Sequence, residues 1–279
     1  MDAIAEFAQE FPAWWLGIFA LLGAIVGSFM NVVICRLPLV LEQRWRRETY
    51  LRSGVPLSAA RSRYNLCWPP SHCPDCQHTL AVRDNIPVFG WLLLRGISRC
   101  CQRPISMQYP LVEVLTILLF IIAVERWPPG MMLLGALILL SSLLVLAVID
   151  IKTGLLPDVI TLPLIWLGLM FNLSGTFVPL NDAVIGAMAG YVSLWLLFWG
   201  FKLLRQKEAL GYGDFKLLAA LGAWMGWRGL PHLVIIAALS GLVVIFVWRK
   251  IRHKNVDEPL AFGPWLALGG SVSLLLDAL

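Results

Sequence analysis

Apolar residues occur along this chain of 279 residues in long runs that are separated by short polar segments. A helix needs about 20 mostly apolar residues to cross a bilayer, and most of the runs approach this length. The runs lie near residues 14–34, 110–125, 131–149, 159–173, 182–201, 215–227, 230–248 and 260–276. They predict an all-α polytopic membrane protein with about eight transmembrane helices. The runs after Pro157 and Asp214 are short, which suits helix ends that border a water-filled cavity.

Composition and charge support a membrane location and indicate an orientation. Hydrophobic residues make up 59% of the chain and charged residues only 14%, unlike a soluble domain of this size. Residues 36–103 contain eleven arginines and four acidic residues, and further basic residues cluster at 202–216 and 249–254. The positive-inside rule places these segments in the cytoplasm and both termini in the periplasm. The net charge of +5 then reflects topology and contact with membrane lipids, not binding of nucleic acid.

The N-terminal segment has three acidic residues and no basic residue before the first apolar run, unlike a cleavable signal peptide. The first helix is therefore expected to remain, and Pro38 is expected to end it. We expect three parts: a first transmembrane helix at 1–35, a cytoplasmic cysteine-containing domain at 36–108 and a helical membrane domain at 109–279.

The predicted cytoplasmic domain contains two pairs of cysteines, Cys73 with Cys76 and Cys100 with Cys101. A C-x-x-C turn presents two sulfurs to a tetrahedral zinc ion, and a second pair closes such a site. In a reducing cytosol a metal is favoured over a disulfide. The second pair is adjacent and chelates one ion less readily, so reduced thiols in a packed loop are the alternative. Possible substitute ligands are His72, His78 and Cys67.

Carboxylates at the ends of apolar runs need a reason, because an aspartate at the bilayer centre costs about 3 kcal/mol. Asp150 and Asp214 have such positions. Two carboxylates that face one water cannot easily both ionise, so one serves as the acid and the other as the base. The simpler alternatives are a charge that reaches the headgroups for Asp150 and a helix N-cap for Asp214. Asp158 is expected to be an N-cap or to support Asp150, and Glu113 to cap its own helix or, as the alternative, to assist the site.

Several short motifs follow one another along most of the chain. They are Gly27-Ser28-Phe29, Arg36-Leu37-Pro38, Ser71-His72-Cys73-Pro74, Asn85-Ile86-Pro87-Val88, Leu94-Arg95-Gly96, Tyr109-Pro110-Leu111-Val112-Glu113, Ile149-Asp150, Leu156-Pro157-Asp158 and Gly211-Tyr212-Gly213-Asp214-Phe215-Lys216. With these motifs in order, the chain from about Gly23 to Pro264 resembles the bacterial type 4 prepilin leader peptidase and N-methyltransferase family.

The resemblance implies a location, an activity and partners. A member of this family lies in the bacterial inner membrane with its active site facing the cytoplasm. It removes the short basic leader of prepilins or pseudopilins by a two-aspartate mechanism. It then methylates the new N-terminus with S-adenosylmethionine. Both type IV pilus and type II secretion substrates are compatible with the sequence, and the remaining partners are inner-membrane lipids.

The resemblance also implies roles for particular residues. The catalytic pair is Asp150 and Asp214. Residues expected to support catalysis or bind substrate are Gly211, Gly213, Lys216 and Asp158, where the glycines allow close approach of an extended substrate. Candidates for methylation are Glu42, Arg46 and Gly96, although the sequence shows no glycine-rich nucleotide cradle. The expected zinc ligands are Cys73, Cys76, Cys100 and Cys101.

The second cysteine pair departs from the family pattern. The usual C-x-x-C would fall on residues 98 and 101, which here are Ser98 and Cys101 with Cys100 added between them. One ligand is thus displaced or lost, which puts the zinc affinity in question.

A different class of function is also compatible with an intramembrane aspartate pair. Transporters and channels use such pairs to bind protons or cations. A transporter would be expected to have repeated halves and discontinuous helices at mid-membrane, and neither is visible in the sequence.

Overall fold

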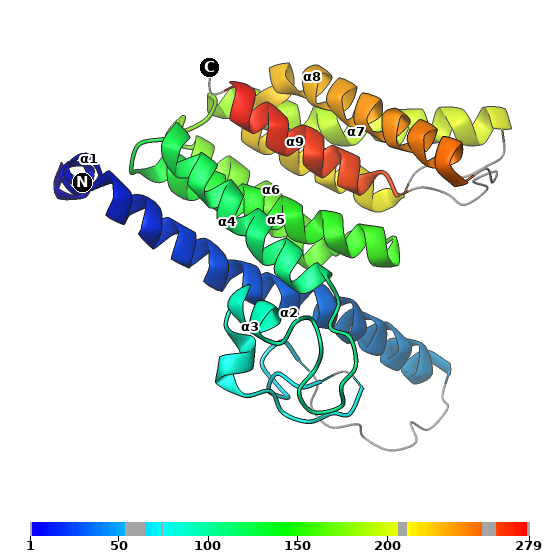
Figure 1. Ribbon diagram of the computed structural model, residues 1–279. Coiled ribbons are helices and arrows are strands. Elements are labelled where there is room, and N and C mark those ends of the chain that lie inside the picture. The colour runs from blue at the N-terminus through cyan, green and yellow to red at the C-terminus, as the bar shows by residue number, and fades with distance from the viewer. Residues whose placement is uncertain (1, 54–64, 74, 206–210, 253–260, 278–279) are drawn as a thin grey trace. The chain divides into compact units, whose positions relative to one another are not determined.

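The computed structural model describes residues 2–53, 65–73, 75–205, 211–252 and 261–277 (Figure 1). Residue 260 of the last predicted run, and Lys207 and Lys254 of the basic clusters, lie outside these ranges. The described residues form helices and no β-strand. Five of the helices are long and apolar enough to cross a membrane, and two more are apolar but shorter. The predicted all-α polytopic membrane protein is confirmed.

The chain forms two compact units, Glu6–Ile122 and Met1–Ala5 with Ala123–Leu279. The helices in the first part of the chain are α1 (Asp2–Glu10), α2 (Pro12–Ser53), the 3-10 helix η1 (Val82–Asn85), α3 (Phe89–Leu93) and α4 (Gln108–Arg126). Those in the rest are α5 (Met131–Thr153), α6 (Asp158–Asn172), α7 (Leu180–Arg205), α8 (Tyr212–Arg252) and α9 (Gly263–Asp277).

The expectation that Pro38 ends the first helix is wrong, because α2 continues through this residue to Ser53. A proline inside a helix costs about 3 kcal/mol, since it removes one hydrogen bond and crowds the preceding turn. Ile34, Leu37 and Leu41 are buried at helical spacing on both sides of Pro38. Burial of one such side chain contributes about 1.5 to 3 kcal/mol. The continued apolar stripe therefore offsets the cost of the proline.

Small residues bring α2 and α4 close together. A Cβ placed on Gly27 would lie 2.8 Å from the Cα of Glu113, and one on Gly23 would lie 3.0 Å from the Cα of Ile117. Such close approach of backbones is how membrane helices gain packing energy without a hydrophobic driving force. The polar end of this interface is closed by the Asn31 side chain, which donates a hydrogen bond to the carbonyl of Tyr109 at 3.0 Å.

The helix α8 is two helices joined at Gly226, which has φ 71° and ψ 174° (yellow and orange in Figure 1). The buried amide of Asn172 donates to the carbonyls of Ala223 at 2.9 Å and Trp224 at 3.2 Å. These are the carbonyls that a break at Gly226 leaves without their usual partners. When α8 is counted as two segments, the described helices correspond to all eight predicted apolar runs.

Candidate active site and metal centre

Asp150 lies in the last turn of α5, and its side chain is only 5% exposed. The helix ends at Thr153 because the next residue, Gly154, adopts a left-handed conformation with φ 64°. The N–H of Gly154 donates to the carbonyl of Asp150 at 2.8 Å. Neighbouring Ile149 is fully buried and anchors this turn against the rest of the unit. The carboxylate is thus held at a fixed point at the end of a membrane helix.

Asp214 lies in the first turn of α8 and is also 5% exposed. Its Oδ2 accepts a hydrogen bond from the backbone N–H of Gly211 at 3.2 Å. Because α8 begins at Tyr212, Asp214 is inside the helix, and the alternative that it is an N-cap is wrong. Leu156 joins the surroundings of the two carboxylates, because it packs against Gly213, next to Asp214, and also lies beside Gly263, next to Asp150.

Asp158 and Lys216 form an ion pair, with Nζ of Lys216 at 2.7 and 2.8 Å from the two carboxylate oxygens. The expectation that Asp158 caps α6 is wrong, since Pro157 holds the N-cap position and no side chain caps the helix there. Asp158 is instead the first helical residue, and its carboxylate joins the start of α6 to the start of α8. The pair is partly exposed, so it contributes about 1 kcal/mol or less.

Leu156 and Gly263 lie beside the aspartates and were not predicted from the sequence. A Cβ on Gly263, at the start of α9, would lie 2.5 Å from Oδ2 of Asp150, so the main chain of α9 lies against this carboxylate. Leu156 packs against Gly213, and a Cβ added to Gly213 would lie 2.7 Å from the Cβ of Leu156. A Gly-Pro pair at the start of the last apolar run was the available signal, because it marks a helix start.

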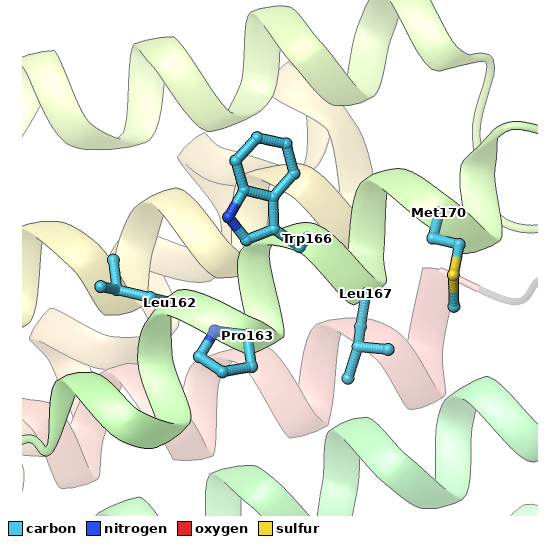
Figure 2. A pocket seen from close by; sticks show the side chains of 5 residues that line it. All are labelled: Leu162, Pro163, Trp166, Leu167 and Met170. Carbon is cyan, nitrogen blue, oxygen red and sulfur yellow. The ribbon is translucent and has the colours of Figure 1, made fainter.

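An apolar pocket of about 420 Å³ lies on one face of α6 (Figure 2). Its lining side chains are Leu162, Pro163, Trp166, Leu167 and Met170. None of them can accept or donate a proton in a reaction near neutral pH, so this pocket is not the candidate active site.

The four predicted zinc ligands lie together, with all four Sγ atoms within 4.8 Å of one another. The Sγ atoms of Cys76 and Cys100 are 3.1 Å apart, and those of Cys73 and Cys101 are 3.6 Å apart. Tetrahedral zinc with bonds of about 2.3 Å separates its sulfurs by about 3.8 Å, so the arrangement fits this ion. His72, His78 and Cys67 are not part of the cluster.

Two similar turns carry these ligands. In the first, the N–H of Gln77 donates to the carbonyl of Cys73 at 3.0 Å; in the second, the N–H of Gln102 donates to the carbonyl of Ser98 at 3.0 Å. Gln77 and Gln102 both have positive φ, 60° and 57°. Ser98 therefore occupies the place in the second turn that Cys73 holds in the first.

The buried hydroxyl of Ser98 points into the cluster. Its Oγ is 3.1 Å from the Sγ of Cys100 and 3.7 Å from that of Cys101. The departure from C-x-x-C thus leaves a fourth sulfur in reach, that of Cys100, with a hydroxyl beside it. Backbone hydrogen bonds, chiefly from the N–H of Cys76, lower the pKa of Cys73 to about 6. Its thiolate, which is the form that binds a metal, is therefore available at neutral pH.

The three methylation candidates have simpler structural explanations. Arg46 and Glu42 pair with each other one turn apart on α2, at 2.6 Å. Gly96 has φ 71°, and a Cβ there would lie 2.8 Å from the Trp91 ring. These contacts give each residue a local structural role, and a part for the three in methylation stays a prediction.

The expectation that Glu113 caps its own helix is wrong. Glu113 lies in the second turn of α4 and is buried, and its Oε2 accepts the backbone N–H of Val88 at 2.7 Å. Val88 is the N-cap residue of α3 and has φ 62°, which is unusual for a β-branched side chain. Glu113 therefore holds the start of α3.

The geometry defines a multi-pass helical membrane protein with a buried pair of aspartates and a separate cysteine cluster. Residues 21–127 match the bacterial peptidase A24 N-terminal domain, and residues 137–246 match the type IV leader peptidase family. The chain is 65% identical to a prepilin leader peptidase/N-methyltransferase of Pectobacterium carotovorum subsp. carotovorum over 277 residues, 99% of each chain. It is 55% identical to the protein of that name from Dickeya chrysanthemi over 279 residues, covering 100% of this chain and 98% of the relative.

The chain belongs to the type IV leader peptidase family. The family identification from the sequence motifs and the expectation of an enzyme are confirmed. A more distant relative with the same name, from Aeromonas hydrophila, is 47% identical over 280 residues, covering 99% of this chain and 95% of the relative. No solved structure matches the chain.

Proposed function

We propose that this protein cleaves the basic leader of prepilins or pseudopilins with Asp150 and Asp214, and then methylates the new N-terminus. The observation that carries the proposal is the burial of both carboxylates at helix ends that meet around Leu156. The relatives named prepilin leader peptidase/N-methyltransferase, which match along the whole chain, support the same substrate and both activities.

The chemistry follows from the shared site of the two carboxylates. One ionised carboxylate takes a proton from a water molecule while the oxygen of that water attacks the scissile carbonyl carbon. The other carboxyl, protonated because two carboxylates that face one water resist joint ionisation, donates its proton to the leaving amine as the C–N bond breaks. Asp150 and Asp214 thus supply both the base and the acid. Gly211 leaves main chain without a side chain next to Asp214, where an extended peptide can approach, whereas the side-chain position of Gly213 is filled by Leu156.

Both aspartates belong to the same side of the membrane. Asp150 is at the end of α5 and Asp214 at the start of α8, with the two helices α6 and α7 between them. Two crossings return the chain to the side that it left. The basic segments place this side in the cytoplasm under the positive-inside rule. A prepilin whose apolar stem is in the inner membrane then presents its basic leader to the pair.

A labelling experiment tests this topology. We expect Thr153→Cys, beside Asp150 on an exposed position, to react with an impermeant maleimide only from the cytoplasmic side of inner-membrane vesicles. Arg228→Cys, next to the break in α8 at the opposite end, is the matched control and should react only from the periplasmic side. Peptide mass spectrometry separates these sites from the native cysteines. Labelling in the reverse sense would contradict the cytoplasmic active site.

S-adenosylmethionine, when bound, supplies the methyl group for the second activity, as the name of the relatives implies. The cysteine cluster fits zinc, with Cys73, Cys76, Cys100 and Cys101 as ligands. Zinc there organises the loops that follow α2 and does not act on the leader peptide. We propose this structural role because four sulfur ligands leave no open position for water on the ion.

The reaction product tests the proposed function. We expect the purified protein, incubated with a prepilin and S-adenosylmethionine, to yield a shortened pilin with one methyl group on its N-terminal nitrogen. Mass spectrometry of the N-terminal peptide measures both changes, and omission of S-adenosylmethionine should leave cleavage alone. A transporter or channel would leave the prepilin uncut and would instead move protons or cations across proteoliposome membranes.

A further inference from the structure

We propose that Gly263, the first residue of α9, is a positioning residue that fixes the carboxylate of Asp150. This role rests on the proposed function of Asp150 in cleavage. The two residues are far apart in the sequence, on α5 and α9, and these helices pack against each other within one unit.

The main chain of α9 meets the Asp150 carboxylate directly. The carbonyl of Phe262 accepts the N–H groups of Trp265 at 3.1 Å and Leu266 at 3.2 Å, so the helix starts at this point. The first N–H groups of a helix have no partner within the helix. Gly263 is at this start, next to the carboxylate of Asp150. A Cβ at this position would lie 2.5 Å from Oδ2, closer than real Cβ contacts come, so any side chain displaces the carboxylate.

The reason for glycine here is space and not backbone conformation, since Gly263 is absent from the residues with positive φ. A second neighbour limits the space. The two methyl carbons of Leu156 would each lie 3.1 Å from a Cβ on Gly263, and the same side chain packs on Gly213. Leu156 is thus held between the starts of α8 and α9. A larger residue at position 263 would therefore meet Leu156 as well as Asp150.

Asp214 also lies against main chain, since its Oδ2 accepts a hydrogen bond from the N–H of Gly211 at 3.2 Å. Each carboxylate of the pair therefore lies against the main chain of a glycine, Asp150 against Gly263 at the start of α9 and Asp214 against Gly211 just before α8. Main-chain neighbours are rigid, and a misplacement of about 1 Å in a catalytic group can cost about 100-fold in rate. Gly263 fixes the position of one half of the pair in this way.

The test compares two alanine substitutions in one helix. A Cβ on Gly270 of α9 would lie 2.5 Å from Cδ2 of Leu221, as close as a Cβ on Gly263 would lie to Oδ2 of Asp150. Leu221, however, is not near the two carboxylates, so Gly270 tests crowding alone. We expect Gly263→Ala to lower kcat for leader cleavage by about 100-fold while KM changes less than about twofold. Gly270→Ala should lower the melting temperature in detergent but leave kcat within a few fold.

The double variant Leu156→Ala with Gly263→Ala separates the carboxylate contact from packing. It removes the Leu156 clash and leaves the added methyl group against Asp150, so it should fold and still cleave slowly. Recovery of kcat in the double variant would overturn the proposal and reduce Gly263 to a packing role, as would normal kcat in Gly263→Ala. The variant Asp150→Asn distinguishes failure of this proposal from failure of the proposed function. If Asp150→Asn cleaves the leader normally, the proposed function of the aspartate pair is wrong. If Asp150→Asn is inactive while Gly263→Ala cleaves normally, only the proposed role of Gly263 is wrong.

Discussion

Replacing either Asp150 or Asp214 with asparagine should abolish leader cleavage. Asparagine preserves the size of the side chain, and at position 214 it can still accept the hydrogen bond from Gly211, but it cannot exchange a proton with water or with the leaving amine. Loss of a general acid or base costs about 10² to 10⁴-fold. We expect kcat for prepilin cleavage to fall by at least about 10³-fold in each single variant, measured by appearance of the mature N-terminus. The double variant should be no worse than either, since neither carboxyl works without the other.

Two comparisons give this prediction its meaning. Methylation of a pilin supplied without its leader requires no aspartate chemistry, so it should persist in both variants and report a folded protein. Asp158→Asn removes only the ion pair with Lys216, which is partly exposed and worth about 1 kcal/mol or less, so cleavage should fall by less than about tenfold. A single Asp150 or Asp214 variant with normal turnover would exclude that residue from the pair.

The membrane segments could be predicted from the sequence because each is a local property of a run of residues. The boundaries at Pro38 and Gly226 show the limits of this signal. Proline is a local reason to end a helix, but the stripe of Ile34, Leu37 and Leu41 gains its energy from residues elsewhere in the chain. The break at Gly226 falls close to the gap between two predicted runs, yet its stabilisation by Asn172 is a contact between distant segments.

The aspartates were found because ionisable residues in apolar runs are costly, and this cost is visible in any sequence. Leu156 and Gly263 carry no such signal. A leucine and a glycine are ordinary in a membrane protein, and their importance arises only from their distance to Asp150 and Gly213. For the same reason the local expectation of caps failed at Asp158 and Glu113. Each carboxylate found a stronger partner across the fold, Lys216 and the N–H of Val88.

The cysteine cluster was predicted from spacing, whereas the place of Ser98 was not. The sequence shows only that one C-x-x-C position is missing. The structure adds that the second turn keeps the conformation of the first, with Ser98 in the ligand place and Cys100 directed toward the same centre. This arrangement makes the effect of substitutions at the cluster predictable.

Replacing Cys73 with serine should remove zinc from the purified protein. We expect the native protein to carry up to one zinc per chain, by elemental analysis after dialysis. Cys73 is the buried member of the cluster, and loss of a ligand should weaken binding more than the roughly 10- to 100-fold typical of a lost outer-shell contact. Cys67→Ser is the matched control, since Cys67 is exposed and outside the cluster, and its metal content should be unchanged.

Ser98→Cys should act in the opposite direction. It restores two C-x-x-C turns, so a zinc ion can be held by two equivalent turns without the adjacent Cys100, and retention against a chelator should rise. Leader cleavage should change much less than methylation in the Cys73 variant, because the cluster and the aspartates belong to different compact units. If the native protein contains no zinc, or if Cys73→Ser leaves its metal content unchanged, the zinc site is wrong. The four cysteines are then thiols in packed turns, and Ser98 lies beside a thiol and not beside a metal-bound thiolate.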